Sequence, residues 1–261
     1  MTYETLDVKQ ENDIVTISLN RPDVHNAMNE QLMKELTQCF QEMSKDKKVR
    51  IIILTGNGKS FCAGADLNWM KSMVNYSKEE NIRDSRLLLD LYETIYQCPK
   101  PVIGKINGHA FGGGIGLVAV CDLVFAIPGC KFAFSETKLG IIPSVISTYI
   151  LRRIIGISHV RRLFLTGERF SSEYAEKIGL LDYIIEENEI DEKIMKYCSI
   201  LKSSGPISIQ EIKELLNSYE QLSIKKYKEH TVEKISELRV SKEGQEGINA
   251  FLEKRKSSWS E

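Results

Sequence analysis

Alternating apolar and polar residues mark the start of the chain. Residues 3–8 and 13–19 alternate in this way on either side of the turn QEND, a pattern that predicts a β-hairpin. Beyond the hairpin, Asn29 is a candidate N-cap. Apolar residues then recur at helical spacing, at Leu32, Leu36, Phe40 and Met43. The chain therefore begins with a predicted hairpin followed by an amphipathic helix.

Strands and helices alternate through the middle of the chain. The run VRIIILTG at 49–56 is apolar without alternation, which is typical of a strand covered on both faces. A helix is predicted from about 77 to 96, and strands are predicted at 101–106, 122–127 and 131–136. This alternation predicts an α/β fold.

Strand patterns stop at about Glu192. The remaining chain carries amphipathic helical patterns, at 194–203, 209–222 and 243–256. We therefore expect an α/β core at 1–195 and a helical C-terminal region at 196–261. The basic end of that region, LEKRKSSW, has the character of a solvated helix face.

Composition and charge narrow the classes of function. The 261 residues are 42% hydrophobic, which is enough to bury a sizeable core. A net charge of −1 and an isoelectric point of about 6.5 argue against a protein that coats nucleic acid or an anionic membrane. The chain shows neither a targeting signal nor an apolar run long enough to span a membrane, so we expect a cytoplasmic protein.

Six cysteines are scattered along the chain without a CxxC pair. Several lie in apolar runs, so we expect buried thiols in a reducing compartment. The histidines, cysteines and acidic residues show no cluster with the spacing of metal ligands, so no metal is expected.

The segment GHAFGGGIGLVAVCD at 108–122 places four glycines at the expected start of a helix, where each costs about 1 kcal/mol relative to alanine. It contains G-x-G-x-x-A, but NGHAFG separates these glycines from the preceding strand, which disfavours a dinucleotide fingerprint. The segment also lacks the Gly-Lys-Ser/Thr of a P-loop. Two explanations remain open. The glycines either let the helix pack closely on a sheet, or present free N–H groups to an oxyanion at the positive end of the helix dipole.

A second loop of the same kind favours the oxyanion explanation. FCAGADL at 61–67 also follows a strand and also turns on a glycine, Gly64. Two N–H groups that converge on one carbonyl oxygen would form an oxyanion hole.

Both loops resemble those of a known family. SFCAGADL (60–67), GHAFGGGIGLVAVCDLVFA (108–126) and FAFSETKLGIIP (132–143) resemble the enoyl-CoA hydratase/isomerase, or crotonase, family in order, spacing and residue type. NRPDVHNAMN (20–29) and RRLFLTGERFSSEYAEKIGLLDYII (161–185) are similar to other family segments. The resemblance implies a crotonase-like spiral of ββα units with a helical C-terminal region at the trimer contacts and over the active site. It also implies homotrimers, or hexamers built from two trimers.

By this resemblance the ligand is an acyl-CoA thioester, and coenzyme A enters only as part of that substrate. The amides of Ala65 and Gly113 match the family's two donors to the thioester oxygen. Adenine would rest against the backbone around Ala27, Ala63 and Ala65, and Asp66 would fix the first loop. The other residues expected to contact the substrate are Gly64, Leu67, His109, Gly112, Gly116, Pro143 and Ser144.

The resemblance also indicates the chemistry. Family hydratases usually carry one glutamate in an E-x-x-L-G segment and another two residues after the glycine triplet. Glu136 matches the former and is the expected catalytic acid–base group, whereas Gly116 occupies the position of the latter. A single carboxylate could move a proton between two carbons, as in an isomerase, or could handle water with or without a second group.

The glycine at 116 and the P-x-V-I-S run after Glu136 are most similar to bacterial methylglutaconyl-CoA hydratase-like members. We therefore expect hydration or dehydration of a branched 2-enoyl-CoA such as 3-methylglutaconyl-CoA, in leucine-type catabolism. Ser144, Ser147 and Arg152 are candidates to meet its distal carboxylate. An enoyl-CoA isomerase and a catalytically inactive thioester binder remain the alternatives.

Overall fold

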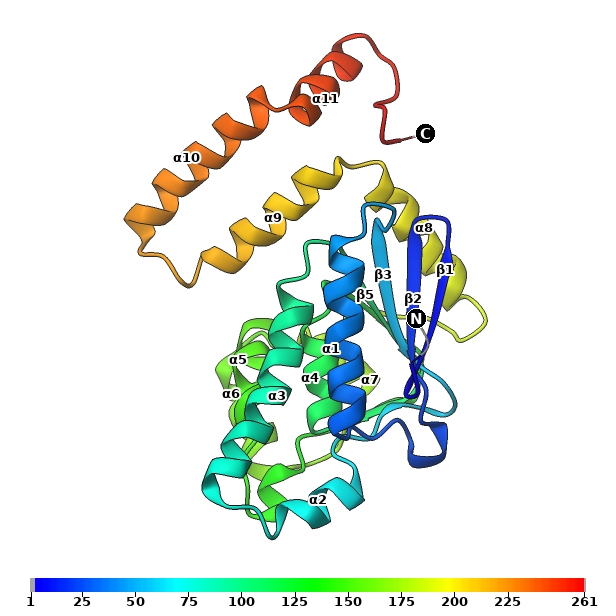
Figure 1. The fold of residues 1–261 in the computed structure, drawn as a ribbon, viewed down its shortest axis with the longest axis vertical. Helices are drawn as coiled ribbons and strands as arrows, with labels where there is room; N and C mark the ends of the chain where they lie inside the picture. The colour runs from blue at the N-terminus through cyan, green and yellow to red at the C-terminus, as the bar shows by residue number, and fades with distance from the viewer. Residues whose placement is uncertain (1–2, 261) are drawn as a thin grey trace.

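A computed structural model describes residues 3–260, which form two sheets, the helices packed around them and a C-terminal arm (Figure 1). The strands are β1 (Leu6–Glu11), β2 (Ile14–Leu19), β3 (Ile51–Gly56), β4 (Ser60–Cys62), β5 (Val102–Ile106), β6 (His109–Phe111), β7 (Leu123–Ala126), β8 (Lys131–Ala133), β9 (Phe170–Ser171) and β10 (Tyr183–Ile184). The α-helices are α1 (Glu30–Lys45), α2 (Leu67–Met73), α3 (Lys78–Tyr96), α4 (Gly113–Ala119), α5 (Ser144–Arg153), α6 (Ile157–Thr166), α7 (Ser172–Lys177), α8 (Ile190–Lys202), α9 (Pro206–Ser218), α10 (Ile224–Val240) and α11 (Lys242–Leu252). Two short 3₁₀ helices are η1 (Pro22–Val24) and η2 (Glu136–Leu139).

The N-terminal prediction is confirmed. Strands β1 and β2 pair antiparallel, and most of their apolar side chains share a core cluster with α1. The side chain of Asn29 accepts a hydrogen bond from the backbone N–H of Leu32 at 2.9 Å and caps α1. The predicted helix at about 77–96 is also present, since α3 begins after a capping box between Ser77 and Glu80.

The two sheets are built by a repeating path of the chain. One sheet has the order β1-β2-β3-β5-β7-β10, and the other has the order β4-β6-β8-β9. Each of the pairs β3/β4, β5/β6 and β7/β8 contributes one strand to each sheet before the chain enters a helix or short helical turn. The expected α/β spiral of ββα units is therefore confirmed, and every residue of β3 is buried, as its unbroken apolar run predicted.

One strand prediction is too long. The pattern KFAFSE predicted a strand to 136, but β8 ends at Ala133, and Glu136 begins η2. The strand ends where its neighbour ends: β6 stops at Phe111, the partner of Ala133, because the chain enters α4 at Gly113. Glu136 therefore lies in the helical turn after β8 and not on a strand.

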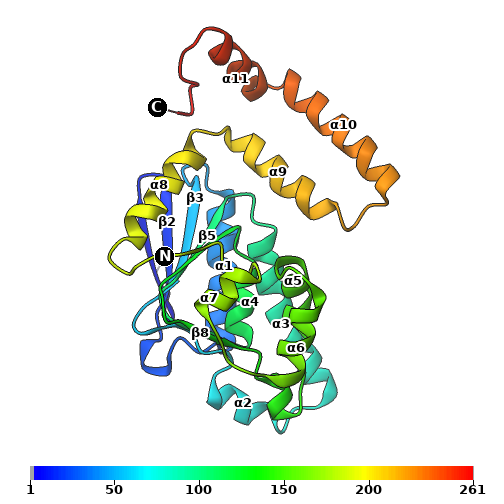
Figure 2. The same ribbon diagram turned by 180° about the vertical axis from the view of Figure 1, so that it is seen from behind.

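The C-terminal arm consists of α9, α10 and α11, which lie at the end of the molecule opposite α2 in both views (Figures 1 and 2). Helix α8 precedes the arm and packs Ile190, Ile194 and Cys198 in a cluster with residues of the larger sheet. The expected boundary at residue 195 falls inside α8, and the division into two regions stays a prediction. The ends of the expected ranges, residues 1–2 and 261, lie outside the described residues.

All six cysteines are free and buried, as expected: Cys39, Cys62, Cys98, Cys121, Cys130 and Cys198. Burial raises the pKa of the Cys62 thiol to about 12. No helix within residues 3–260 combines the length and the apolar character that crossing a membrane requires.

Candidate active site

Two neighbouring strands of the smaller sheet bring the two glycine-containing loops together. Strands β4 and β6 pair in parallel, with Ser60 opposite His109 and Cys62 opposite Ala110. The carboxyl ends of parallel strands meet at the same edge of a sheet, so the loop after Cys62 and the start of α4 lie side by side. The two predicted donor positions therefore come from adjacent points of one sheet edge.

Glycine is required in both loops by backbone conformation. Gly64 has φ +91°, and Gly112 combines φ +47° with ψ −121°, conformations that residues with a side chain rarely adopt. A Cβ atom at Gly64 would also lie 2.8 Å from the carbonyl oxygen of Phe111, so the two loops approach too closely for a side chain. These glycines let the first loop turn against the second.

The first predicted donor is the N–H of Ala65. Met28 pairs with this loop as in a parallel sheet, because its N–H donates to Gly64 O at 2.7 Å and its carbonyl accepts from Asp66 N–H at 2.8 Å. This pairing uses the groups on either side of Ala65 and leaves the Ala65 amide pointing away. Among residues 3–260 the Ala65 N–H has no hydrogen-bond partner, and the residue is exposed.

The second predicted donor is the N–H of Gly113, the first residue of α4. A first-turn N–H has no partner within its own helix, and no other described residue accepts from this one. The hydroxyl of Tyr92 donates to the Gly113 carbonyl at 2.7 Å and so anchors the other side of this residue. Ala65 and Gly113 thus carry free N–H groups and line the same cavity, as the two donors of an oxyanion hole must.

Asp66 connects the first loop to its surroundings. Its carboxylate accepts from the backbone N–H groups of Asn68 at 2.8 Å and Trp69 at 3.3 Å, which caps α2. It also forms an ion pair with Arg21 at 2.8 Å, and Arg21 donates to the carbonyl of Ala27. Burial alone would raise the pKa of Asp66, but these hydrogen bonds, led by the one from Arg21, lower it below its usual value.

Glu136 reaches the same place from η2. Its Oε1 lies 3.2 Å from the point where a Cβ atom of Gly112 would be, so the carboxyl group packs against the glycine loop. Its Oε2 is buried and has no hydrogen-bond partner among the described residues. Burial raises the pKa of Glu136 above its usual value. A buried carboxylate of raised pKa with one oxygen free of hydrogen bonds is suited to proton transfer.

The space beside Gly116 is filled. A Cβ atom there would lie 2.6 Å from both the Cγ2 of Ile146 and the Cζ of Tyr92. Tyr92 and Ile146 are 0% and 2% exposed, so neither can swing into solvent. The position at which the resemblance predicts the second glutamate of a hydratase is therefore filled by Tyr92 and Ile146, and leaves no room for a side chain.

A cavity of about 160 Å³ opens onto the two donors and Glu136. Its wall is mainly apolar and includes Met28, Trp69, Met73, Leu88, Val145 and Ile146. Pro143 and Ser144, both expected at the substrate, also line it. Glu136 and Asp84 are the only charged residues among those that line it. The volume is below the range of about 300–1,000 Å³ typical of drug-sized ligands, which favours a short acyl group.

The structure brings some of the other expected residues to this site and leaves others outside. Ala63 donates its N–H to His25 O at 3.0 Å, which places it beside the loop that holds Ala27. His109 does not line the acyl cavity, because its ring lies on the outer side of β6 and accepts from the Lys131 N–H at 3.2 Å. Leu67 is 74% exposed on α2 and does not line the cavity either.

The candidates for binding a distal carboxylate are also separated from the cavity. Arg152 pairs with Glu220 at 2.6 Å and stacks over the ring of Tyr96, and the hydroxyl of Ser147 donates to the Ser144 carbonyl at 2.5 Å. Neither side chain lines the cavity. No residue of the arm lines it, so the expected cover by the C-terminal region would have to come from another copy of the chain.

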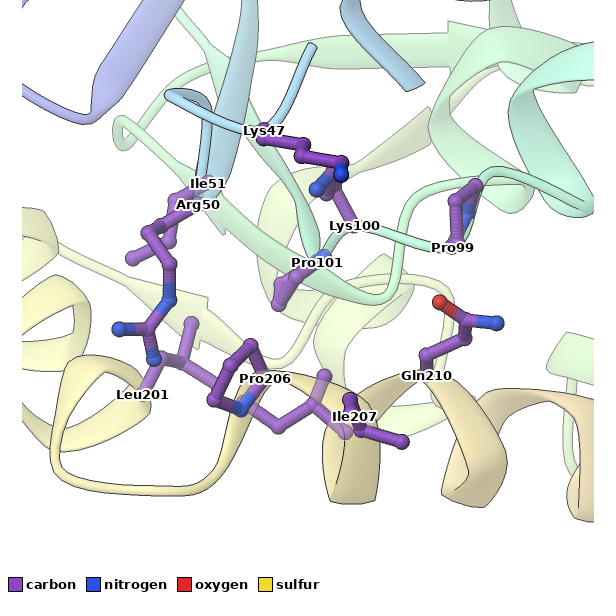
Figure 3. A pocket seen from close by; sticks show the side chains of 11 residues that line it. Lys47, Arg50, Ile51, Pro99, Lys100, Pro101, Leu201, Pro206, Ile207 and Gln210 are labelled. Atoms are coloured by element: carbon purple, nitrogen blue, oxygen red, sulfur yellow. The ribbon is translucent and has the colours of Figure 1, made fainter. Parts of the chain in front are cut away.

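A wider hollow of about 430 Å³ lies at the base of the arm, between the loop before β5 and the start of α9 (Figure 3). Lys47, Arg50 and Lys100 line it, together with prolines and aliphatic side chains. Its lining includes no acid or histidine that could move a proton. Within the described chain, no group of three or more His, Cys, Asp or Glu residues could hold a metal ion.

Sequence reasoning did not find Tyr92, Ile146, Arg21 or the residues on α2 and α3 that face the cavity. Tyr92 and Ile146 act on a glycine that lies more than twenty positions away in the chain, and their own segments look like ordinary helix. Arg21 could have been noticed, because it lies in the NRPDVHNAMN segment that carries part of the family resemblance.

Comparisons with known proteins agree with this geometry. The family model described as enoyl-CoA hydratase/isomerase matches residues 9–261. A crotonyl-CoA hydratase of Syntrophomonas wolfei is 30% identical over 260 residues, which cover 99% of each chain. A mitochondrial enoyl-CoA hydratase of Pongo abelii is 32% identical over 248 residues, which cover 95% of this chain and 84% of the relative. The crystal structure of an enoyl-CoA hydratase from Shewanella pealeana superposes with a TM-score of 0.94 and 36% identity, covering 98% of this chain and 96% of that one. The chain belongs to the enoyl-CoA hydratase/isomerase family and has the crotonase fold.

Proposed function

We propose that the protein is a hydro-lyase that adds water to a short, branched 2-enoyl-CoA, or removes it in the reverse reaction. The single observation that carries the proposal is the buried, unpartnered Oε2 of Glu136 beside the free N–H groups of Ala65 and Gly113. The relative named crotonyl-CoA hydratase supports an enoyl thioester as the substrate class.

In the proposed reaction one carboxylate handles one proton twice. Glu136 takes a proton from water while the water oxygen bonds to C3 of the enoyl group, and the electron pair of the double bond moves to the thioester oxygen. The N–H groups of Ala65 and Gly113 stabilise the resulting enolate, each contributing roughly 3–4 kcal/mol. Glu136 then donates the same proton to C2, which completes the addition of H and OH. No second glutamate is needed for this balance.

Two closely related branched substrates fit the proposal. The similarity of the sequence to methylglutaconyl-CoA hydratase-like proteins supports 3-methylglutaconyl-CoA, which ends in a carboxylate. 3-Methylcrotonyl-CoA has the same branched double bond without that carboxylate, and the mainly apolar wall of the cavity supports it. Either substrate is consistent with the proposed role in leucine-type catabolism.

Enoyl-CoA isomerisation is a second candidate, and a specific observation favours it. Tyr92 and Ile146 fill the space of the second glutamate, so a single carboxylate faces the position of the α-carbon, as an isomerase requires. Turnover of each enoyl-CoA in isotopically labelled water distinguishes the two. A hydratase places one labelled oxygen in the product, whereas an isomerase forms a product without it. No turnover of any 2- or 3-enoyl-CoA, with thioester binding retained, would instead support the inactive binder.

We also propose assembly as a homotrimer or a pair of trimers. The support is the arm, where Ile212, Leu216, Val232 and Ile235 of α9 and α10 are 47–65% exposed in the single chain. Light scattering coupled to size-exclusion chromatography tests this, and a monomer at micromolar concentration would contradict it.

We also propose a cytoplasmic location, which the six free thiols support.

A further inference from the structure

A second carboxylate faces the acyl cavity from α3. Asp84 lines the cavity that Glu136, Ala65 and Gly113 also line. The indole N–H of Trp69 donates to Asp84 Oδ1 at 2.9 Å and joins α2 to α3 at this wall. An indole N–H can only donate, so this bond favours the charged form of the carboxyl group.

Nothing in the lining compensates for this charge. The other charged residue of the cavity, Glu136, is also an acid, and the lining contains no lysine, arginine or histidine. Arg152, which the sequence suggested for this role, is held by Glu220 and by the ring of Tyr96. The pKa of Asp84 lies above its usual value. Burial is the main cause, the bond from Trp69 opposes it, and the nearby charge of Glu30 adds to it. The wall that this chain supplies around the acyl group is therefore either negative or neutral. Lys34 and Arg83 share a separate hollow with Asp84, but neither lines the acyl cavity.

We propose that Asp84, held by Trp69, is a specificity-determining residue that selects uncharged acyl groups and disfavours acyl groups ending in a carboxylate. The inference rests on the proposed function and decides between its two members in favour of the 3-methylcrotonyl type. A distal carboxylate would bring a second negative charge against Asp84 in a partly desolvated cavity, where like charges within about 10 Å repel strongly enough to reduce affinity at least tenfold.

The test compares kcat/KM for 3-methylcrotonyl-CoA and 3-methylglutaconyl-CoA, two substrates that differ only in the distal carboxylate. We expect the wild type to favour the uncharged substrate by about tenfold or more, and Asp84→Asn to reduce this ratio at least about fivefold, chiefly through a lower KM for the charged substrate. Asp90→Asn is the matched control, because it removes the same charge from an exposed position of α3 that does not line the cavity. It should leave the ratio unchanged.

A binding measurement separates failure of this inference from failure of the proposed function. Isovaleryl-CoA and 3-methylglutaryl-CoA are the saturated counterparts of the two substrates, and their dissociation constants need no turnover. A shift of their affinity ratio in Asp84→Asn supports the inference even if the protein hydrates neither enoyl thioester. Trp69→Phe, which removes the N–H and keeps a ring, should shift the ratio in the same direction by a smaller factor. Equal ratios in the wild type, Asp84→Asn and Asp90→Asn, or a wild type that prefers the carboxylated thioesters, would overturn the inference.

Discussion

The filled space beside Gly116 makes a quantitative prediction about a single methyl group. In Gly116→Ala the new Cβ would lie 2.6 Å from Ile146 Cγ2, 2.6 Å from Tyr92 Cζ and 2.8 Å from Tyr92 Oη. Carbon atoms pack at about 3.5–4.0 Å, so the neighbours must move by about 1 Å. Both neighbours are buried, and Tyr92 is additionally held by its hydrogen bond to Gly113.

The magnitude follows from two opposing effects. Overpacking in a rigid core costs about 1–3 kcal/mol, and the two buried neighbours place Gly116→Ala near the upper value. Alanine regains about 1 kcal/mol of helix propensity relative to glycine. The net loss in the free energy of unfolding is about 2 kcal/mol, which for a chain of this length corresponds to a fall in Tm of about 4–8 °C.

Urea denaturation and thermal melting of purified variants measure this loss. Gly247→Ala is the matched control, because this glycine also lies within a helix, α11, but a Cβ there meets only the outer edge of the Trp259 ring, at 3.0 Å. Its stability should be unchanged or higher. In a double-mutant cycle with Ile146→Ala, the cavity left by Ile146 should accept the new methyl group and give a favourable coupling of about 1 kcal/mol.

Two results would refute this reasoning. One is a Gly116→Ala variant as stable as the wild type, with no coupling to Ile146→Ala. The other is a folded Gly116→Glu variant that hydrates enoyl-CoA faster than the wild type, since the added carboxylate would then have reached a site that Tyr92 and Ile146 are predicted to close.

Three further predictions concern the groups around the donors. Burial raises the pKa of Glu136, so its ionised form opposes folding, and the protein loses stability as the pH rises from the unfolded pKa through the folded one. Glu136→Gln should therefore be more stable than the wild type at neutral pH, and pH-dependent urea titrations should show the difference shrinking as the pH falls through this range. Asp66→Asn keeps a capping side chain for α2 but loses the ion pair with Arg21, so it should lower the free energy of unfolding by about 1–3 kcal/mol. Asp66→Ala also loses the cap and should cost about 1 kcal/mol more. Equal stability of the two variants in melting experiments would show that the cap contributes nothing. Tyr92→Phe removes the hydrogen bond to the Gly113 carbonyl, so steady-state kinetics should show a kcat several-fold lower with KM little changed. A kcat equal to that of the wild type would show that Gly113 needs no such anchor.

Much of the fold was predictable because its signals are local. The hairpin, the caps at Asn29 and Ser77 and the unbroken apolar run of β3 are each encoded within a few consecutive residues. The end of β8 was not, because it depends on where the neighbouring strand β6 ends, at Phe111 opposite Ala133. Helix α2 was missed as well, since its seven residues include none that is buried and so carry no helical stripe.

The candidate site divides in the same way. The donors and Glu136 could be named from motifs, because the backbone of a glycine turn and one acidic side chain define their roles. Tyr92, which fills the space beside Gly116, and Asp84, which is bonded to Trp69, could not be named, because their roles depend on partners in other elements that only the folded chain brings close. The sequence showed that a glutamate is absent at 116, and the structure shows what occupies its place.

The most direct test of the central claim is turnover by Glu136→Gln, measured together with thioester binding. The substrate is the 2-enoyl-CoA that the wild type turns over fastest, and Glu187→Gln, which changes an exposed glutamate, is the control. If Glu136 is the group that moves the proton between water and C2, kcat should fall about 10²-fold or more while the dissociation constant of the saturated acyl-CoA changes less than about threefold. A Glu136→Gln variant that retains near-wild-type kcat would contradict the account.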